Sequence, residues 1–258
     1  MRQHKPFRSE MGFSTADRIV VRGLDLVEDI IGKVPLGDVA WLEINGSLPT
    51  PEQSAVFNAL MVTLVEHGMT PNAIAARLTY LGAPEALNAA VAAGLCGVGS
   101  TFAGTAENSA RLLQDALKGA TDPDLARLAS DIVRDFRASK QPIPGLGHPV
   151  HKPIDPRSPR LFEVARQNGY YGNYCELIQL IAAEAERASG KLLPVNATGA
   201  IGAIASELGL DWRICRGIAV MARAIGLVGH IAEELRQPLA REIWERVDHE
   251  VSEDLSQR

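Results

Sequence analysis

Residues 50–96 read TPEQSAVFNALMVTLVEHGMTPNAIAARLTYLGAPEALNAAVAAGLC, and this stretch decides the fold class. Thr50 can cap a helix, Pro51 suits the first helical position, and Gln53 can reach back to the cap. Apolar residues then recur at helical spacing, and two further helix starts that contain proline follow within the stretch. The stretch therefore predicts three consecutive helices.

The rest of the chain continues the pattern. The composition is 46% apolar and 22% charged, with few aromatic residues and abundant Ala and Leu, which favours helix over sheet. We find no convincing pair of strands and expect an all-α fold of about a dozen helices. The later helices are predicted near residues 103–118, from 124 onward, and at 159–167, 173–189, 198–208 and beyond 211.

The domain organisation is read from breaks in this pattern. Residues 1–16 have no helical periodicity and are predicted to form an N-terminal arm, with one large helical domain over 17–258. Proline and glycine signals near residue 120 allow a smaller lobe within 120–200.

Charge and cysteine content narrow the class of protein. A formal net charge of −5 with scattered basic residues gives no support to nucleic-acid binding. Three widely spaced cysteines, together with an N-terminus that lacks an apolar signal segment, predict a cytoplasmic protein with reduced thiols. The longest apolar run is interrupted by Arg223, His230 and Glu233, so we expect no membrane insertion.

A long segment without helical periodicity, residues 141–159, holds the strongest candidate site. It contains six prolines and two glycines, and long loops between strong helices are usually functional. Glycines on either side of Leu146 let the backbone approach a ligand, while Lys152 and Arg157 supply positive charge near His148. The alternative interpretation is a rigid, solvated loop.

Three other places are candidates. His67 ends a predicted helix, where a histidine also acts simply as a favourable C-terminal cation. Asn196 and Thr198 stand at a helix N-terminus, which suits an anion or carbonyl but equally an ordinary cap. Arg223 lies among apolar residues, so it should meet either an acidic partner or an anionic ligand.

Metal binding is not expected. His148 and His151 lie three residues apart near Asp155, but an intervening proline and the lack of a helix argue against a facing ligand pair. Motifs typical of phosphate-binding loops, zinc proteases and serine hydrolases are absent from the sequence.

Several spaced motifs together resemble the citrate synthase family, in the right order over about residues 17–245. They are GDVAWLEINGSLPT (37–50), PIPGLGHPVHKPIDPRSPRL (142–161), LPVNATGAIGAI (193–204) and ARAIGLVGHIAEEL (222–235). Within the family, LMVTLVEHG (60–68) and GVGSTFAGTAENSARLL (97–113) are similar to the citryl-CoA lyase branch, including the C-terminal module of ATP-citrate lyase.

The resemblance implies a citrate-synthase-like helical fold, a CoA ester and an organic acid as ligands, and a homodimer or a multiple of one. It also implies roles for individual residues. His148 would contact the reacting oxygen and His67 the organic acid, with the other substrate and CoA contacts expected from Arg157, Arg223, Phe102, Asn196, Leu146, Gly147 and Lys152.

Two departures from the family pattern bear on the reaction. Phe102 stands where full citrate synthases have histidine, and the lyase branch shares the phenylalanine. Thr198 stands where the family has its catalytic aspartate, and a threonine hydroxyl is a poor base near neutral pH.

Three hypotheses therefore stay open at the level of sequence. The chain is a citryl-CoA-lyase-like carbon–carbon lyase with an altered acid/base, or an enzyme of different CoA-ester chemistry such as a hydrolase, or a non-catalytic binder.

Overall fold

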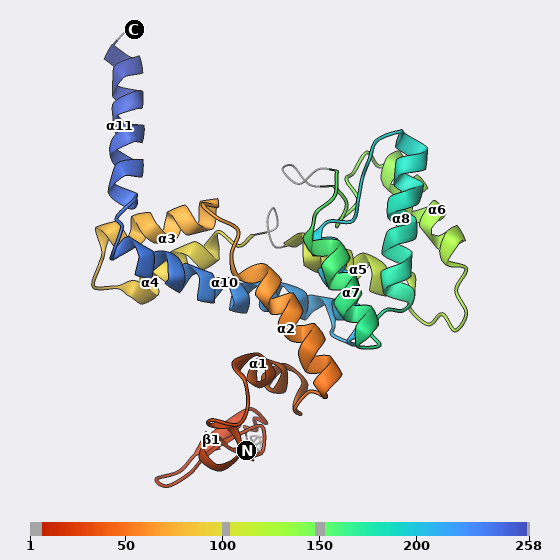
Figure 1. The fold of residues 1–258 in the computed structure, drawn as a ribbon, viewed down its shortest axis with the longest axis horizontal. Helices are drawn as coiled ribbons and strands as arrows, with labels where there is room; N and C mark the ends of the chain where they lie inside the picture. Colours follow the sequence, from red (N-terminus) through yellow and green to blue (C-terminus); the bar gives the residue numbers. More distant parts are fainter. Residues whose placement is uncertain (1–6, 100–103, 148–152, 257–258) are drawn as a thin grey trace, which may run out of the picture. The chain divides into compact units, whose positions relative to one another are not determined.

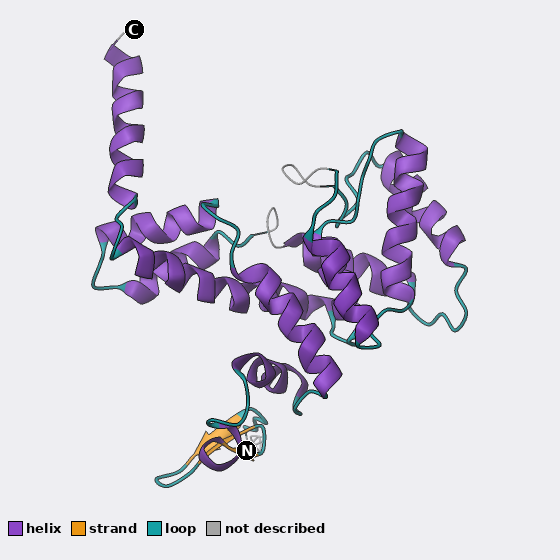
Figure 2. Cartoon of the chain, in the orientation of Figure 1, coloured by secondary structure: helices purple, strands orange, loops and turns teal. Residues whose placement is uncertain are grey.

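The computed structural model describes residues 7–99, 104–147 and 153–256 (Figure 1). Helices dominate these residues, with strands confined to one small sheet near the N-terminus (Figure 2), which confirms the predicted fold class. The helices are α1 (Leu36–Asn45), α2 (Pro51–Val65), α3 (Pro71–Gly82), α4 (Leu87–Cys96), α5 (Gly104–Ala116), α6 (Leu125–Ala138), α7 (Arg157–Gln167), α8 (Asn173–Ser189), α9 (Ala197–Glu207), α10 (Trp212–Glu234) and α11 (Ala240–Ser256), with a short π-helix, η1 (Leu26–Ile30).

The chain divides into two compact units, residues 1–59 and 60–258. The first holds the sheet, η1, α1 and the beginning of α2; the second holds the end of α2 and all later helices. The arm at 1–16 and the lobe within 120–200 stay predictions.

The small sheet was not expected from the sequence. Strands β1 (Gly12–Ser14), β2 (Ile19–Val21) and β3 (Leu24–Asp25) pair antiparallel in that order. Arg22 and Gly23, both with positive φ, form the two-residue turn between β2 and β3. The signal was a β-branched run followed by a glycine turn. Strands of two or three residues are too short to show alternation.

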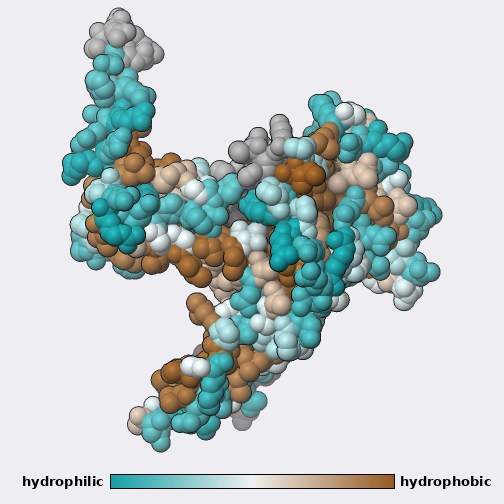
Figure 3. Space-filling model, in the orientation of Figure 1, coloured by the Kyte–Doolittle hydropathy of each residue, from teal (hydrophilic) through white to brown (hydrophobic). Residues whose placement is uncertain are grey.

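The core of the first unit is small. Trp41 of α1 meets Phe57 of α2 edge to face, with ring centroids 5.3 Å apart, and both rings are buried. Large apolar side chains nevertheless remain exposed here, and Figure 3 shows brown surface over this part of the chain. They include Phe13, Ile19, Val27, Ile31 and Leu36.

Helix starts follow the capping signals in the sequence. At the start of α2, the Thr50 N–H donates to Gln53 Oε1 at 2.9 Å and the Gln53 N–H donates to Thr50 Oγ1 at 3.2 Å, a complete capping box. Asp124 and Asp211 cap α6 and α10 through their carboxylates. These predicted helix starts are confirmed.

Helix α9 lies at the centre of the second unit. It packs against α5, α7, α8 and α10, and nearly all of its residues are buried. Close packing requires small side chains: a Cβ on Gly202 would come within 2.8 Å of the Ala106 carbonyl oxygen on α5. The Ala/Gly-rich sequence of this helix predicted such close packing, and the structure confirms it.

Helix α10 is long and apolar enough to cross a membrane by length and composition alone. In the structure it packs against α3, α4, α5 and α9, as a core helix of a globular protein does. Its packing brings Arg223 and His230 next to the end of α2, where the candidate site lies.

Candidate functional site

A cavity of about 900 Å³ lies in the second unit, between the end of α2, the starts of α3, α7 and α9, the helices α5 and α10, and the loop 141–147. It is lined by seven of the residues that the sequence singled out: His67, Leu146, Gly147, Arg157, Asn196, Thr198 and Arg223. The other three, Phe102, His148 and Lys152, lie outside the described residues.

The loop before α7 is joined to the extended link before α9. Leu146 and Val195 form an isolated antiparallel bridge. The Gly147 N–H donates to the Pro194 carbonyl at 2.8 Å, and the Asn196 N–H donates to the Gly145 carbonyl at 2.9 Å. Segments 50 residues apart in sequence thus form one wall of the cavity.

Two glycines allow this contact. Gly145 has φ +86°, and a Cβ there would come within 2.6 Å of the Gly199 Cα. A Cβ on Gly199 would in turn meet the Gly145 carbonyl oxygen at 2.4 Å. Gly145 is therefore required for packing of the loop on α9, and its role in ligand approach stays a prediction.

Asp155 organises the positive side of the cavity. Its fully buried carboxylate accepts from Arg157 Nε at 2.9 Å and Nη2 at 2.8 Å, and from the Ala197 N–H at 2.9 Å. Burial by itself would raise the pKa of Asp155, but the hydrogen bonds from Arg157 and Ala197 outweigh it and lower the pKa from 3.8 to about 2. The carboxylate therefore fixes both Arg157 and the first turn of α9.

Arg223 reaches the cavity from α10 as a poorly compensated cation. Its Nη1 atom is buried and has no hydrogen-bond partner in the described part of the chain. Burial lowers the pKa of Arg223, and the positive charge of Arg157 lowers it further. The negative charge of Glu66 raises the pKa but does not outweigh these two effects. Two guanidinium groups on one cavity suit an anionic ligand, and Glu66 is an acidic neighbour of Arg223, so both alternatives for Arg223 stay predictions.

The start of α9 contributes a polar but uncharged group. Asn196 Oδ1 accepts from the Gly199 N–H at 3.0 Å and from the Thr198 hydroxyl at 2.7 Å, while its Nδ2 donates to the Gly147 carbonyl at 2.6 Å. Asn196 is therefore the helix cap. The Thr198 hydroxyl uses its proton on Asn196 and can only accept a further hydrogen bond from the cavity.

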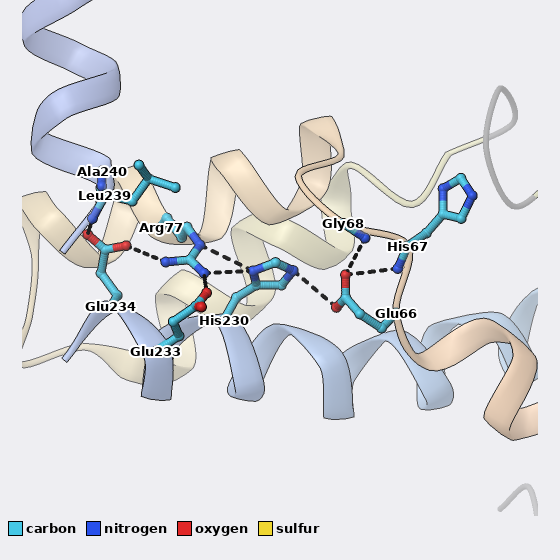
Figure 4. A network of polar contacts seen from close by, with 9 residues as sticks. All are labelled: Glu66, His67, Gly68, Arg77, His230, Glu233, Glu234, Leu239 and Ala240. Atoms are coloured by element: carbon cyan, nitrogen blue, oxygen red, sulfur yellow. Dashed lines mark hydrogen bonds and ion pairs between the residues drawn. The ribbon is translucent and has the colours of Figure 1, made fainter. Parts of the chain in front are cut away.

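His67 lies beyond the end of α2. The Glu66 carboxylate holds the turn that carries it, accepting from the His67 N–H at 2.8 Å and the Gly68 N–H at 2.6 Å. Figure 4 shows the imidazole of His67 pointing away from this carboxylate.

Among the polar residues that line the cavity, Asn72 and Arg111 were not predicted from the sequence. Asn72, at the start of α3, is 6% exposed, and its Nδ2 has no partner within the described residues. Arg111 on α5 pairs with Asp115 at 3.5 Å and stacks over the Trp212 ring, adding a third cation. Both stand inside regular helical patterns, which is why the sequence gave no sign of a binding role.

No group of three or more metal-ligating side chains occurs in the ranges that the structure describes. The sequence also raised a metal site formed by His148, His151 and Asp155. Both histidines lie outside the described ranges. Asp155 itself is fully used by Arg157 and Ala197.

Comparison with known proteins gives a consistent result. Residues 40–244 match the family model for the citrate synthase C-terminal domain. The fold is similar to that of citryl-CoA lyase from Hydrogenobacter thermophilus, with 35% identity and a TM-score of 0.81, over 90% of this chain and 88% of that one.

Larger proteins share the fold. ATP citrate lyase from Methanothrix soehngenii, solved with citrate and coenzyme A, has a TM-score of 0.74 at 21% identity, over 92% of this chain and 40% of that one. A probable ATP-citrate synthase from Dictyostelium discoideum is 24% identical over 85% of this chain and 37% of its own length. The chain spans about a third of the length of such curated relatives, at 37% for this one and 32% for two from Arabidopsis thaliana.

Proposed function

This chain belongs to the citrate synthase family, and on that premise we propose that it is a carbon–carbon lyase acting on a CoA ester of the citryl type. The substrate would be citryl-CoA or a related 3-hydroxyacyl-CoA. The products would be acetyl-CoA and a keto acid such as oxaloacetate.

The observation that carries the proposal is Arg223, whose buried Nη1 has no hydrogen-bond partner among the described residues, beside Arg157 on a cavity of about 900 Å³. Carboxylates of an organic acid would satisfy these donors, and the planar fork of arginine suits them. The volume falls in the range of sites for small ligands and cofactors, roughly 300–1,000 Å³. Asn72 would donate a further hydrogen bond to the same acid.

The CoA portion is proposed to lie along the loop 141–147. Leu146 and Gly147 present backbone there, and Lys152 would meet a phosphate. Two relatives support this choice of ligand class: ATP citrate lyase was solved with citrate and coenzyme A from Methanothrix soehngenii, and with (3S)-citryl-CoA from Methanosaeta concilii.

Cleavage requires two proton movements. A base takes the proton of the substrate hydroxyl, the bond between C2 and C3 breaks as the keto group forms, and the acetyl-CoA enolate accepts a proton. We assign His148 to the substrate oxygen, and His67 with the arginines to the organic acid. Directed N–H donors would stabilise the charge that develops on oxygen.

Thr198 lacks the acid/base group that this reaction requires. Its hydroxyl proton is donated to Asn196, so it can hold a water molecule or accept a hydrogen bond but cannot act as an acid of useful strength. The loss of an ideal acid/base costs on the order of 10²–10⁴-fold in rate. This favours slow citryl-CoA cleavage, and it keeps a non-catalytic CoA and organic-acid binder as the second candidate.

The test is incubation of the purified chain with citryl-CoA, followed by mass spectrometry of all CoA species and of the acids. Equal amounts of acetyl-CoA and oxaloacetate support the lyase. Release of citrate and free CoA shows hydrolysis instead. Binding of citryl-CoA by calorimetry without any product identifies a binder.

The variant Arg223→Met tests whether the substrate binds in the cavity. Removing a charge-assisted hydrogen bond worth about 1.5–3 kcal/mol should weaken substrate binding by roughly ten- to hundredfold. Arg246→Met is the matched change on α11, where Arg246 is largely exposed and pairs with Glu250. It should behave as the wild type. Equal effects of the two variants would remove the cavity from the proposal.

A further inference from the structure

A chain of polar contacts runs from the interior of the protein to the turn that carries His67 (Figure 4). At its centre is Arg77 of α3, which is 0% exposed. Its guanidinium donates to Glu234 Oε2 at 2.6 Å, to Glu233, and to Nδ1 of His230 from Nη2 at 3.0 Å and Nε at 3.2 Å. Glu234 also accepts from the Leu239 and Ala240 N–H groups at the start of α11. The buried arginine is thus fully compensated.

Arg77 determines which nitrogen of His230 carries the proton. A guanidinium can only donate, so Nδ1 of His230 must accept and the ring proton resides on Nε2. Nε2 lies 3.0 Å from Glu66 Oε2. The imidazole therefore presents its Nε2 proton on the side of Glu66, in a close polar contact whose angles fall short of a hydrogen bond. A buried cation fixes the orientation of the ring from the other side.

Glu66 connects this buried pair to the cavity. One carboxylate oxygen meets His230, and the other accepts from the N–H groups of His67 and Gly68. Burial would raise the pKa of Glu66, but the hydrogen bonds from the His67 and Gly68 N–H groups and the contact with His230 lower it overall, so the carboxylate stays ionised at neutral pH.

The surface of α10 is shaped for this contact. Arg223, Gly226 and His230 recur at helical spacing and lie on one face of the helix. A Cβ on Gly226 would come within 2.0 Å of the Val65 carbonyl oxygen and 3.1 Å of Glu66 Oε2. One face of α10 therefore supplies the cavity's arginine, admits the end of α2, and binds Glu66.

We propose that His230, oriented by Arg77, is a positioning residue that holds Glu66 and thereby fixes the His67 turn relative to Arg223 on the cavity. His230 does not touch the substrate. Its effect on an organic acid in the cavity passes through Glu66 and the backbone of residues 67 and 68.

This inference rests on the proposed function for its choice of ligand, so its test has one arm that needs no turnover. Protein labelled with [15N]histidine gives few backbone amide signals because the chain has six histidines. The His67 signal is assigned by its loss in His67→Asn. Citrate affinity is measured in parallel by calorimetry.

Two substitutions at position 230 separate the contacts of the ring. Asn can accept from Arg77 near the position of Nδ1 but is too short to reach Glu66. Gln can donate to Glu66 near the position of Nε2. We expect His230→Asn to shift the His67 amide signal and weaken citrate binding about tenfold, as for loss of one hydrogen bond. His230→Gln should restore both to near wild-type values.

Two further variants complete the test. His249→Asn on α11, where the histidine is largely exposed and pairs with Glu253, should change neither measurement. If His230→Asn fails to fold, Glu66→Gln at a half-exposed site places an amide donor against Nε2, and it should shift the His67 signal as well.

The proposal is overturned if a folded His230→Asn leaves the His67 signal in place, or if His230→Gln behaves like His230→Asn. In the second case the ring matters through packing alone. If the wild type binds no citrate, the organic acid of the proposed function is wrong, while the amide signal still decides the positioning role.

Discussion

Asn72 carries a buried side-chain donor on the wall of the cavity. Its Nδ2 is unsatisfied within the described residues, while its Oδ1 accepts from the Thr70 hydroxyl. An unsatisfied buried donor typically costs about 1–3 kcal/mol, and a ligand oxygen in the cavity would remove that cost. Residues of this kind tend to trade stability for binding.

We therefore predict opposite effects of Asn72→Ala on stability and binding. Unfolding in urea should show a variant as stable as the wild type or more stable by about 1 kcal/mol. Calorimetry should show citrate binding weakened about tenfold. An affinity equal to that of the wild type would mean that Asn72 does not face the ligand.

Thr198→Asp tests which residue limits the chemistry. If the chain is a lyase that has lost its acid/base, we expect the variant to cleave citryl-CoA on the order of 10²-fold faster or more, because a carboxylate can carry the proton that threonine cannot. The rate is followed by release of acetyl-CoA. If Thr198→Asp instead abolishes turnover of a CoA ester that the wild type handles well, threonine is an adaptation to other chemistry.

At the scale of elements, Asp155 joins the loop, α7 and α9. Its folded-state pKa of about 2 lies below the ordinary 3.8, so its contribution to stability is complete above pH 4 and is lost as pH falls from about 4 to about 2. A shift of this size corresponds to roughly 2 kcal/mol.

Asp155→Asn should therefore be destabilised most at neutral pH. We expect its deficit in unfolding free energy relative to the wild type to shrink as urea titrations move from pH 7 to pH 2.5. A constant deficit would show that Asp155 acts through packing rather than through its charge.

The elements differ in how well sequence predicts them. Helices with a side-chain cap and strong periodicity, such as α2 and α6, begin where the local signals place them, because capping is decided within four residues. The sheet was missed because its strands are two or three residues long. Local pattern carries too little information at that length.

The residues of the candidate site also differ in how well the sequence predicts them. Motif resemblance selected Arg157 and Arg223, which the structure brings to one cavity. Arg77 and His230 became significant only through a contact between segments about 150 residues apart, which no local pattern encodes. Asn72 became significant through its burial on the cavity wall. Gly145 was noticed for its freedom of conformation, but the neighbour that requires it, Gly199, could not be known in advance.

At the scale of the whole molecule, apolar surface remains uncovered. Large apolar side chains on α10 and α11 are about half exposed, and contiguous exposed apolar patches mark interaction surfaces. They are Ile225, Val228, Trp244, Val247 and Val251.

Association of identical chains would cover such surface, and we predict a homodimer or a multiple of one. Light scattering at micromolar concentration should give at least twice the mass of one chain. A mass equal to one chain over the whole accessible concentration range would contradict this. A cytoplasmic location, which the sparse free cysteines favour, remains a proposal.

Because Asn196 caps α9 by accepting from the Gly199 N–H, this cap does not require a particular side chain at residue 198. Mutational drift at this one position can therefore abolish or restore a proton carrier while the surrounding architecture persists. Reconstructed ancestors of this chain would be expected to share the cavity and its arginines but to differ in their rate of citryl-CoA cleavage. One amino-acid substitution would then account for the difference in activity.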